Sequence, residues 1–168
     1  MPSSAFRFQP PEGSGPTADP GSAHDADRSE TPGLERPLPP GSVPVVAAVA
    51  RRDHRVLIAL RGPGRRHAGL WEFPGGKVRE GEGLDEAMRR ELTEELGVGA
   101  SEVGRPLFQA RDPGSPFVIL FIPVRLSGNP RALEHERLAW RAPEELDDLP
   151  LAPSDARFVR EYLLAQNS

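Results

Sequence analysis

Three glutamates close together in the sequence are the first candidates for a reactive site. Glu91, Glu94 and Glu95 are related by three and four positions, so on a helix their carboxylates project to one side. Like charges at this spacing repel by about 0.2–0.5 kcal/mol per exposed pair, and the helix dipole disfavours anions in the last turn. The pattern fits either a solvated helix surface or a bound cation that offsets the repulsion.

Two glycines and a fourth glutamate precede this group. Gly75 and Gly76 suit a tight loop where backbone approaches a ligand closely, and Glu82 follows them. Carboxylate and backbone carbonyl oxygens are the hard ligands that Mg²⁺ prefers, often sharing the ion with substrate phosphates. Because the chain has no cysteine, the oxygen-rich pattern predicts Mg²⁺ or Mn²⁺ acting in an attack on a phosphoryl group.

A helix over residues 84–96 is expected to carry the three glutamates. One apolar stripe spaced by four residues consists of Leu84, Met88, Leu92 and Leu96. Gly97 suits the C-cap position of this helix.

Strands are expected on both sides of that helix. Apolar runs predict strands at 43–50, 56–60, 103–109, 117–124 and within 133–140. A last helix is expected from Ser154 to about Leu164, with Ser154 as its N-cap. Strands interrupted by two helices indicate an α/β or α+β domain in which a helix packs on a mixed sheet.

Composition divides the chain into two parts. Nine of the first 40 residues are proline and four are glycine, so residues 1–42 are expected to form a disordered tail, and 43–168 one folded domain. The net charge of −4 argues against a nucleic-acid polymer or an anionic membrane as the main partner. No signal peptide or apolar stretch of about 20 residues is present, which predicts a cytoplasmic protein. The sequence gives no indication of an oligomeric state.

Residues 76–98 resemble the Nudix box, which reads Gly, five residues, Glu, seven residues, then Arg-Glu-aliphatic-x-Glu-Glu-x-Gly-aliphatic. The matching positions are Gly76, Glu82, Arg90, Glu91, Leu92, Glu94, Glu95, Gly97 and Val98. The resemblance implies a Nudix-type α/β/α sandwich with a mixed β-sheet, in which the box forms a loop, a helix and a second loop.

The resemblance also implies roles for individual residues. The implied ligands of Mg²⁺, or Mn²⁺, are the carbonyl of Gly75 and the carboxylates of Glu91, Glu94 and Glu95. Arg90 would orient the glutamates by charge-assisted hydrogen bonds, and Glu82 would tie the loop to the helix start. Glu91, Glu94 and Arg90 are therefore the expected catalytic residues of the box.

The stretch LWEFPGGKVREGE resembles the MutT-like branch, which hydrolyses nucleoside triphosphates to monophosphate and pyrophosphate and cleanses the nucleotide pool. The spacing from Arg61 to Glu72 resembles the same branch and implies that Arg61 contacts phosphates. Glu134 lies six residues before Trp140, as an acidic residue does in relatives, and is expected to be a metal ligand or the general base. His135 and Glu136 compete with Glu134 for this role.

Base recognition is expected in LPLAPSDARF, residues 149–158. Relatives place Asn or Asp at the position of Asp155, and an ionised aspartate offers only acceptors. It would suit the amine of guanine or cytosine, which indicates 8-oxo-dGTP or a cytidine-type triphosphate as substrate; a plain role in the first helical turn is the alternative. Phe73, with Phe121 and Trp140, would line the base pocket or belong to the core.

Two other functions are compatible with the box. ADP-ribose pyrophosphatases, which act on nucleoside-diphosphate linkages, often have a proline about 15 residues past the box, and Pro113 lies there within an Asp-Pro-Gly turn. A catalytically silent Nudix domain that senses a ligand is the third possibility. Such domains often lack box glutamates, whereas all are present here.

Overall fold

The computed structural model describes residues 33–167 of the chain. Most of the predicted tail, residues 1–32, therefore lies outside the described residues. Its last ten residues do not form a separate tail, because Leu34 and Leu38 pack against the buried core beside the first helix. Glu35 also pairs with Arg105 at 2.9 Å. The folded part thus begins earlier than position 43.

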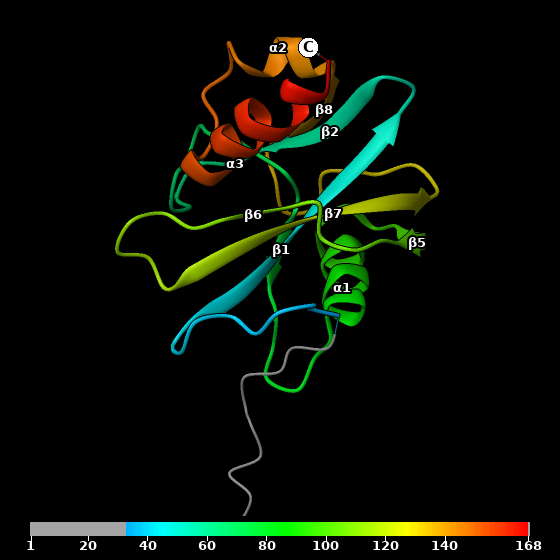
Figure 1. Cartoon of the computed structure of the whole chain (residues 1–168). Helices are drawn as coiled ribbons and strands as arrows, with labels where there is room; N and C mark the ends of the chain where they lie inside the picture. Colours follow the sequence, from blue (N-terminus) through cyan, green and yellow to red (C-terminus); the bar gives the residue numbers. More distant parts are fainter. Residues whose placement is uncertain (1–32, 168) are drawn as a thin grey trace, which may run out of the picture.

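Eight strands of residues 33–167 pair into one mixed sheet (Figure 1). They are β1 (Val43–Arg52), β2 (Arg55–Leu60), β3 (Trp71–Glu72), β4 (Gly75–Lys77), β5 (Gly99–Val103), β6 (Phe108–Ala110), β7 (Phe117–Ser127) and β8 (Arg137–Arg141). The helices are α1 (Leu84–Leu96), α2 (Pro143–Leu146), α3 (Pro153–Phe158), the π-helix η1 (Val159–Leu163) and the 3₁₀ helix η2 (Ala165–Asn167). None of these helices is long and apolar enough to cross a membrane.

A parallel pair of strands, β1 and β7, forms the centre of the sheet. Its register runs from Val43 opposite Phe117 to Ala50 opposite Val124. The other pairings are antiparallel, and the main path through the sheet is β3-β2-β1-β7-β5. A parallel pair needs a long crossover connection, and the segment from β2 to β6, which contains α1, supplies it.

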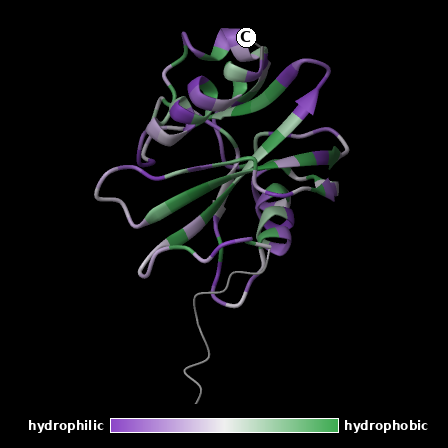
Figure 2. Ribbon diagram, viewed as in Figure 1, coloured by the Kyte–Doolittle hydropathy of each residue, from purple (hydrophilic) through white to green (hydrophobic). Residues whose placement is uncertain are grey.

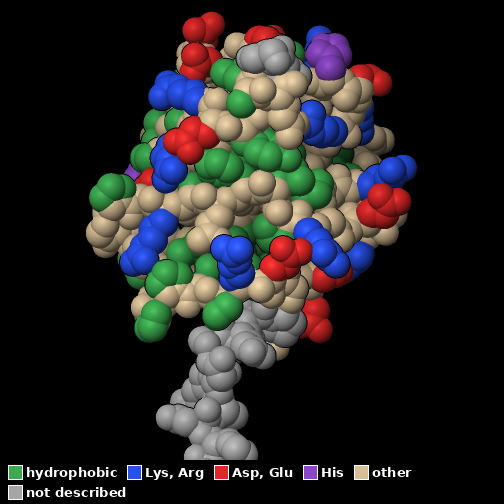
Figure 3. Space-filling view, viewed as in Figure 1, with side chains coloured by type: hydrophobic (Ala, Val, Ile, Leu, Met, Phe, Trp, Pro, Cys, Tyr) green, Lys and Arg blue, Asp and Glu red, His purple; other side chains and the backbone are tan. Residues whose placement is uncertain are grey.

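Helices cover both faces of this sheet. Along β1, Val46, Ala48 and Ala50 point toward α1, whereas Ala47 and Val49 point toward α3 and η1, as the two-residue period of a strand requires. Figure 2 shows hydrophobic residues concentrated along the central strands. On the face drawn in Figure 3, basic and acidic side chains surround a central group of hydrophobic ones. The predicted α/β/α sandwich with a mixed sheet is confirmed.

Helix α1 has the predicted bounds. Its four stripe residues are all buried, and Gly97 ends the helix in the left-handed region with φ 64°. The backbone N–H of Gly97 donates to the carbonyl of Thr93, which is the 5→1 bond of the αL cap, and the N–H of Val98 donates to the carbonyl of Leu92. The segment after β7 adds two more bonds, because Arg131 donates to the carbonyl of Leu96 at 2.9 Å and Leu133 to that of Glu95 at 3.0 Å.

The predicted strand 103–109 is wrong, because the structure divides this segment. β5 ends at Val103 and β6 begins at Phe108, and both pair with β7. Pro106 lies between them, and proline has no N–H to donate to a ladder.

The start of the last helix also differs from the prediction. α3 begins at Pro153, and its N-cap residue Ala152 makes no side-chain cap bond. Ser154 is not the cap, because its hydroxyl donates to Asp112 Oδ1 at 2.9 Å. Helix α2 was not predicted, because a single turn shows no periodicity.

Candidate active site

Two adjoining cavities lie on the surface of the domain. The first has a volume of about 330 Å³ and is lined by Phe73, Asp155 and Phe117, among others. The second has a volume of about 270 Å³. Arg61, Glu72, Gly75 and Gly76 line both cavities. A substrate with two chemically different ends could therefore occupy both at once.

Carboxylates dominate the second cavity. It is lined by Glu72 of β3, Glu91 and Glu95 of α1, and Glu134 of the loop before β8. Burial, together with the charges of Glu72, Glu91 and Glu134, raises the pKa of Glu95 to about 8, although the N–H of Gly75 opposes the shift. Four acidic groups around one cavity repel one another, so a cation placed among them would be stabilised.

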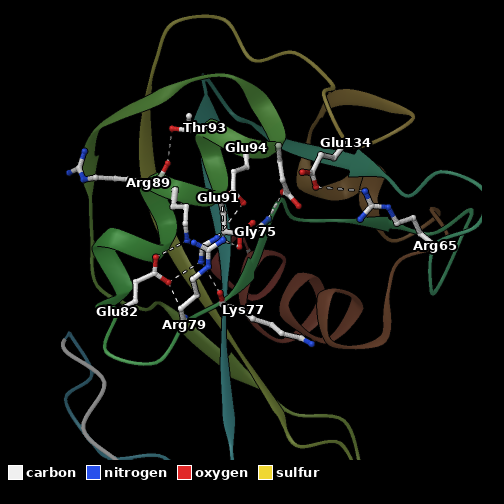
Figure 4. A network of polar contacts seen from close by, with 12 residues as sticks. Arg65, Gly75, Lys77, Arg79, Glu82, Arg89, Glu91, Thr93, Glu94 and Glu134 are labelled. Atoms are coloured by element: carbon white, nitrogen blue, oxygen red, sulfur yellow. Dashed lines mark hydrogen bonds and ion pairs between the residues drawn. The ribbon is translucent and has the colours of Figure 1, made fainter.

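Arg90 contacts Glu82, Glu91, Glu94 and Lys77, four residues labelled in the polar network of Figure 4. Its guanidinium donates to both carboxylate oxygens of Glu82, at 2.7 and 2.9 Å. It also lies 2.6 Å from Glu91 Oε1, 3.4 Å from Glu94 Oε2 and 2.9 Å from the carbonyl of Lys77. Hydrogen bonds from Arg90 lower the pKa of Glu82 to about 2. The hydrogen bonds expected from Arg90 to the glutamates are present. Glu82 binds Arg90 and so connects the loop to the middle of α1 rather than to its start.

The expected metal ligands do not all face the same space. Glu91, Glu95 and Gly75 line the second cavity, but the side chain of Glu94 is 42% exposed and faces Arg79 and Arg90. Within residues 33–167, no three acidic or histidine side chains converge closely enough to form a ready-made metal site. Arg90 pairs with Glu91 and Glu94, and the N–H of Gly75 binds Glu95. The donor set consists of oxygen atoms with excess negative charge, which fits a hard divalent cation.

Gly75 and Gly76 form part of strand β4 rather than a free loop. Gly75 pairs opposite Ala47 in β1. A Cβ atom on Gly75 would overlap the carbonyl of Val46, and one on Gly76 would overlap the carboxylate of Glu91. The two glycines are therefore needed for close approach, as predicted, first to the neighbouring strand and then to α1.

Glu72 joins Arg61 to His135. Its Oε2 lies 2.6 Å from Nε of Arg61, and its Oε1 lies 3.0 Å from Nε2 of His135. Burial opposes ionisation of Glu72, but hydrogen bonds from His135 and Arg61 outweigh it and hold the pKa below its usual value. Arg61, the expected phosphate contact, lies at the boundary of the two cavities. The role of Glu72 was not predicted from the sequence, although a charged residue between the aromatic residues Trp71 and Phe73 is a signal for it.

Asp155 forms the floor of the first cavity. The residue is 7% exposed, and its Oδ1 accepts the backbone N–H of Phe73 at 2.7 Å. Burial raises its pKa to about 8, which favours the protonated form of the carboxyl group. In that form Asp155 would donate as well as accept, unlike the acceptor-only aspartate expected from the sequence.

The aromatic residues expected near the base divide between cavity and core. Phe73 lines the first cavity and packs edge-on against Phe121 and Phe158. Phe121 is fully buried in the core. Trp140 lines neither cavity and instead lies under the guanidinium of Arg52 at 4.6 Å.

Three residues before β8 are the candidates for an additional metal ligand or the general base: Glu134, His135 and Glu136. Glu134 and His135 line the second cavity, whereas Glu136 does not. The side chain of Glu134 is 40% exposed and lies 3.8 Å from Arg65, so it can reach solvent water. This geometry favours Glu134 over Glu136.

Comparisons with known proteins agree with this architecture. The sequence pattern of the NUDIX domain family matches residues 41–162. The CTP pyrophosphohydrolase of Escherichia coli K12 is 37% identical over 124 residues, which cover 72% of this chain and 91% of that protein. The putative 8-oxo-dGTP diphosphatase 2 of Mycobacterium tuberculosis is 35% identical over 126 residues, covering 73% and 89%.

A solved structure shows the same fold. The crystal structure of a MutT NUDIX hydrolase from Burkholderia pseudomallei superposes with a TM-score of 0.63 at 30% identity, covering 72% of this chain and 98% of that one. The chain belongs to the Nudix family, and its relatives are of the MutT-like kind.

Proposed function

We propose that this protein is a metal-dependent MutT-like hydrolase that cleaves a nucleoside triphosphate to a nucleoside monophosphate and pyrophosphate. The observation that carries the proposal is the pair of cavities joined at Arg61 and Glu72. The acidic second cavity suits a triphosphate with its cation, and the first suits a base. The similarity to a CTP pyrophosphohydrolase and to an 8-oxo-dGTP diphosphatase supports this substrate class.

The residues of the second cavity have separate tasks in this proposal. Glu91, Glu95 and the carbonyl of Gly75 would hold the ion, and Glu94, which lies at the surface, is a further candidate ligand. A bound Mg²⁺ or Mn²⁺ neutralises charge on the phosphate oxygens and makes water a better nucleophile. Arg90 orients Glu91 and Glu94 through the bonds described above.

Proton transfer is assigned to Glu134. A water oxygen bonds to a phosphorus atom of the substrate while the bond from that phosphorus to a bridging oxygen breaks. The carboxylate of Glu134 takes the proton of the water as general base. The bridging oxygen leaves with the electron pair of the broken bond, which gives the nucleoside monophosphate and pyrophosphate. Arg61, held by Glu72, binds the phosphate chain with its two-pronged guanidinium.

The base is assigned to the first cavity, against Phe73 and Asp155. A protonated carboxyl group offers one donor and one acceptor. This pair matches the edge of cytosine that carries N3 and the N4 amine, or the edge of guanine that carries O6 and N1–H. The same pair also matches adenine and uracil, so the choice among bases rests on the similarity to a CTP pyrophosphohydrolase and an 8-oxo-dGTP diphosphatase. We assign a cytidine-type triphosphate or a guanine-type one such as 8-oxo-dGTP as the substrate class, and the reaction would cleanse the nucleotide pool.

A panel of nucleotides with pyrophosphate detection tests the proposal. We expect pyrophosphate from dCTP or 8-oxo-dGTP with Mg²⁺ or Mn²⁺, and none after EDTA. Release of AMP from ADP-ribose with every triphosphate inert would replace the proposal by the ADP-ribose pyrophosphatase activity. No turnover of any substrate would indicate a silent ligand-sensing domain.

The proposal extends to the chain as a whole. We assign the catalytic domain to residues 33–167, with a nucleotide as its small-molecule partner. A cytoplasmic location follows from the proposed substrate.

A further inference from the structure

The side chain of His135 is buried next to the candidate active site. It is 5% exposed and directly follows Glu134, the proposed general base. Its Nε2 lies 3.0 Å from Glu72 Oε1, and its Nδ1 is buried without a hydrogen-bond partner. An unsatisfied buried polar atom is destabilising, so packing and stability do not explain why a histidine occupies this position.

Glu72 divides its two carboxylate oxygens between different partners. Oε1 faces His135, while Oε2 faces Nε and Nη2 of Arg61 at 2.6 and 2.5 Å. Because an ionised carboxylate only accepts, Nε2 of His135 carries the proton of this hydrogen bond. The orientation of the Glu72 carboxylate is thus fixed from both sides.

Arg61 depends on this carboxylate for its own orientation. Its Nε and Nη2 are bound by Glu72, and its Nη1 donates to the carbonyl of Arg66 at 2.8 Å. The guanidinium is planar, so three fixed contacts set the direction in which its remaining N–H groups point. Arg61 lines both cavities.

Without His135, Arg61 alone would hold the Glu72 carboxylate, through Oε2. Glu72 shares the second cavity with Glu91, Glu95 and Glu134, and like charges favour rotation of its carboxylate away from them. The hydrogen bond from His135 opposes this rotation.

We propose that His135 is a positioning residue that, through Glu72, aims the Arg61 guanidinium at the phosphate chain of the substrate. The inference rests on the proposed function, because it concerns how that substrate is bound. His135 itself touches neither the phosphates nor the attacking water. Its loss should therefore weaken substrate binding and leave the chemical step nearly intact.

Three substitutions separate positioning from packing. His135→Leu keeps the volume and removes the donor, and His135→Asn keeps polarity but is too short to reach Glu72. Both should raise KM about tenfold, the size of one charge-assisted hydrogen bond, with little change in kcat. His135→Gln places an amide N–H near the position of Nε2 and should restore most of the wild-type KM. Equal KM values in all four proteins would overturn the inference.

A double-mutant cycle tests whether the effect passes through Arg61. Arg61→Lys keeps the charge but loses the two-pronged geometry. If His135 acts through Arg61, the double variant with His135→Leu should have the same KM as Arg61→Lys alone. Additive effects on KM would contradict the proposed route.

Two measurements need no turnover and so distinguish failure of this inference from failure of the proposed function. Binding of inorganic tripolyphosphate with Mg²⁺, followed by calorimetry, should weaken about tenfold in His135→Leu and recover in His135→Gln. Nitrogen NMR of the wild-type protein should show His135 protonated at Nε2, and Glu72→Gln should shift that signal. The inference is wrong if a folded His135→Leu variant binds tripolyphosphate as the wild type does. It is also wrong if Glu72→Gln leaves the NMR signal of His135 unchanged, and both results hold even if nucleotides are hydrolysed. If His135→Leu does not fold, the Asn and Gln variants decide by the same measurements.

Discussion

Glu95 Oε2 accepts a hydrogen bond from the backbone N–H of Gly75 at 2.9 Å, across 20 positions of sequence. This bond joins the glycine strand β4 directly to helix α1. It also holds the Glu95 carboxyl group at the wall of the second cavity, where burial and three neighbouring glutamates disfavour its negative charge. A cation in this cavity would reverse that preference.

Substitution of Glu95 by glutamine should separate folding from activity. The amide oxygen can still accept the N–H of Gly75, so thermal stability should change little. We expect kcat/KM with Mg²⁺ to fall about 10²-fold or more, because a bound metal ion stabilises the transition state by several kcal/mol. Glu80→Gln, at an exposed position before the same helix, is the matched control and should retain wild-type activity. A fully active Glu95→Gln enzyme would remove Glu95 from the cation site.

Alanine at the two adjacent glycines should have different effects. In Gly75→Ala the new Cβ meets the backbone of β1, so we expect the free energy of unfolding to fall by about 1–3 kcal/mol. In Gly76→Ala the Cβ meets the carboxylate of Glu91, which can swing away. Stability should then be nearly kept while activity falls about 10²-fold, because a catalytic group is displaced by about 1 Å. Denaturant unfolding and kcat measured on both variants check this, and equal stability of the two would contradict it.

Asp155 should make stability depend on pH. Its pKa is raised from 3.8 to about 8 in the folded protein, so the folded protein binds a proton that the unfolded chain has lost. By linkage, this contribution to the free energy of unfolding is fully present below the unfolded value and is lost as the pH rises toward about 8. The amide introduced by Asp155→Asn does not ionise in either state, so the Tm of this variant should rise relative to wild type by about 3 °C or more over that range. A Tm difference that is constant with pH would contradict the burial of the carboxyl group.

Truncation should locate the start of the folded domain. Removal of residues 1–32 should leave the free energy of unfolding and the activity unchanged. Removal of residues 1–38 takes away Leu34 and Leu38, which pack on the core, and should lower the free energy of unfolding by about 1–3 kcal/mol. The full chain with Leu34→Ala and Leu38→Ala is the control and should lose a similar amount. If both truncated proteins had the same free energy of unfolding, the result would support the domain start at residue 43 that the sequence predicts.

Local patterns explain what the sequence could predict. Helix α1 was predictable because its buried stripe repeats every four residues and Gly97 supplies the left-handed end. The site was predictable where residues of one element carry it, as with Arg90 and its contacts to Glu91 and Glu94.

Features that depend on distant parts of the chain were not predictable. The pKa of Asp155 is set by burial and by the N–H of Phe73, 82 positions away. Serine often caps helices, but the hydroxyl of Ser154 donates to the carboxylate of Asp112 in another loop. Glu94 matches the box as well as Glu95 does, and only the packing shows that one lies at the surface and the other inside.

Side chains alternate along β1, so its residues pack against α1 on one face of the sheet and against α3 and η1 on the other. Residues that line the first cavity, such as Asp155, belong to the layer of α3, while Glu91 and Glu95 of the second cavity belong to α1 on the other face. If the first cavity binds the base as proposed, exchange of residues in the α3 layer should change which base is accepted without repacking the helix that carries the proposed metal ligands. Redesign of selectivity should therefore begin at α3 and leave α1 untouched.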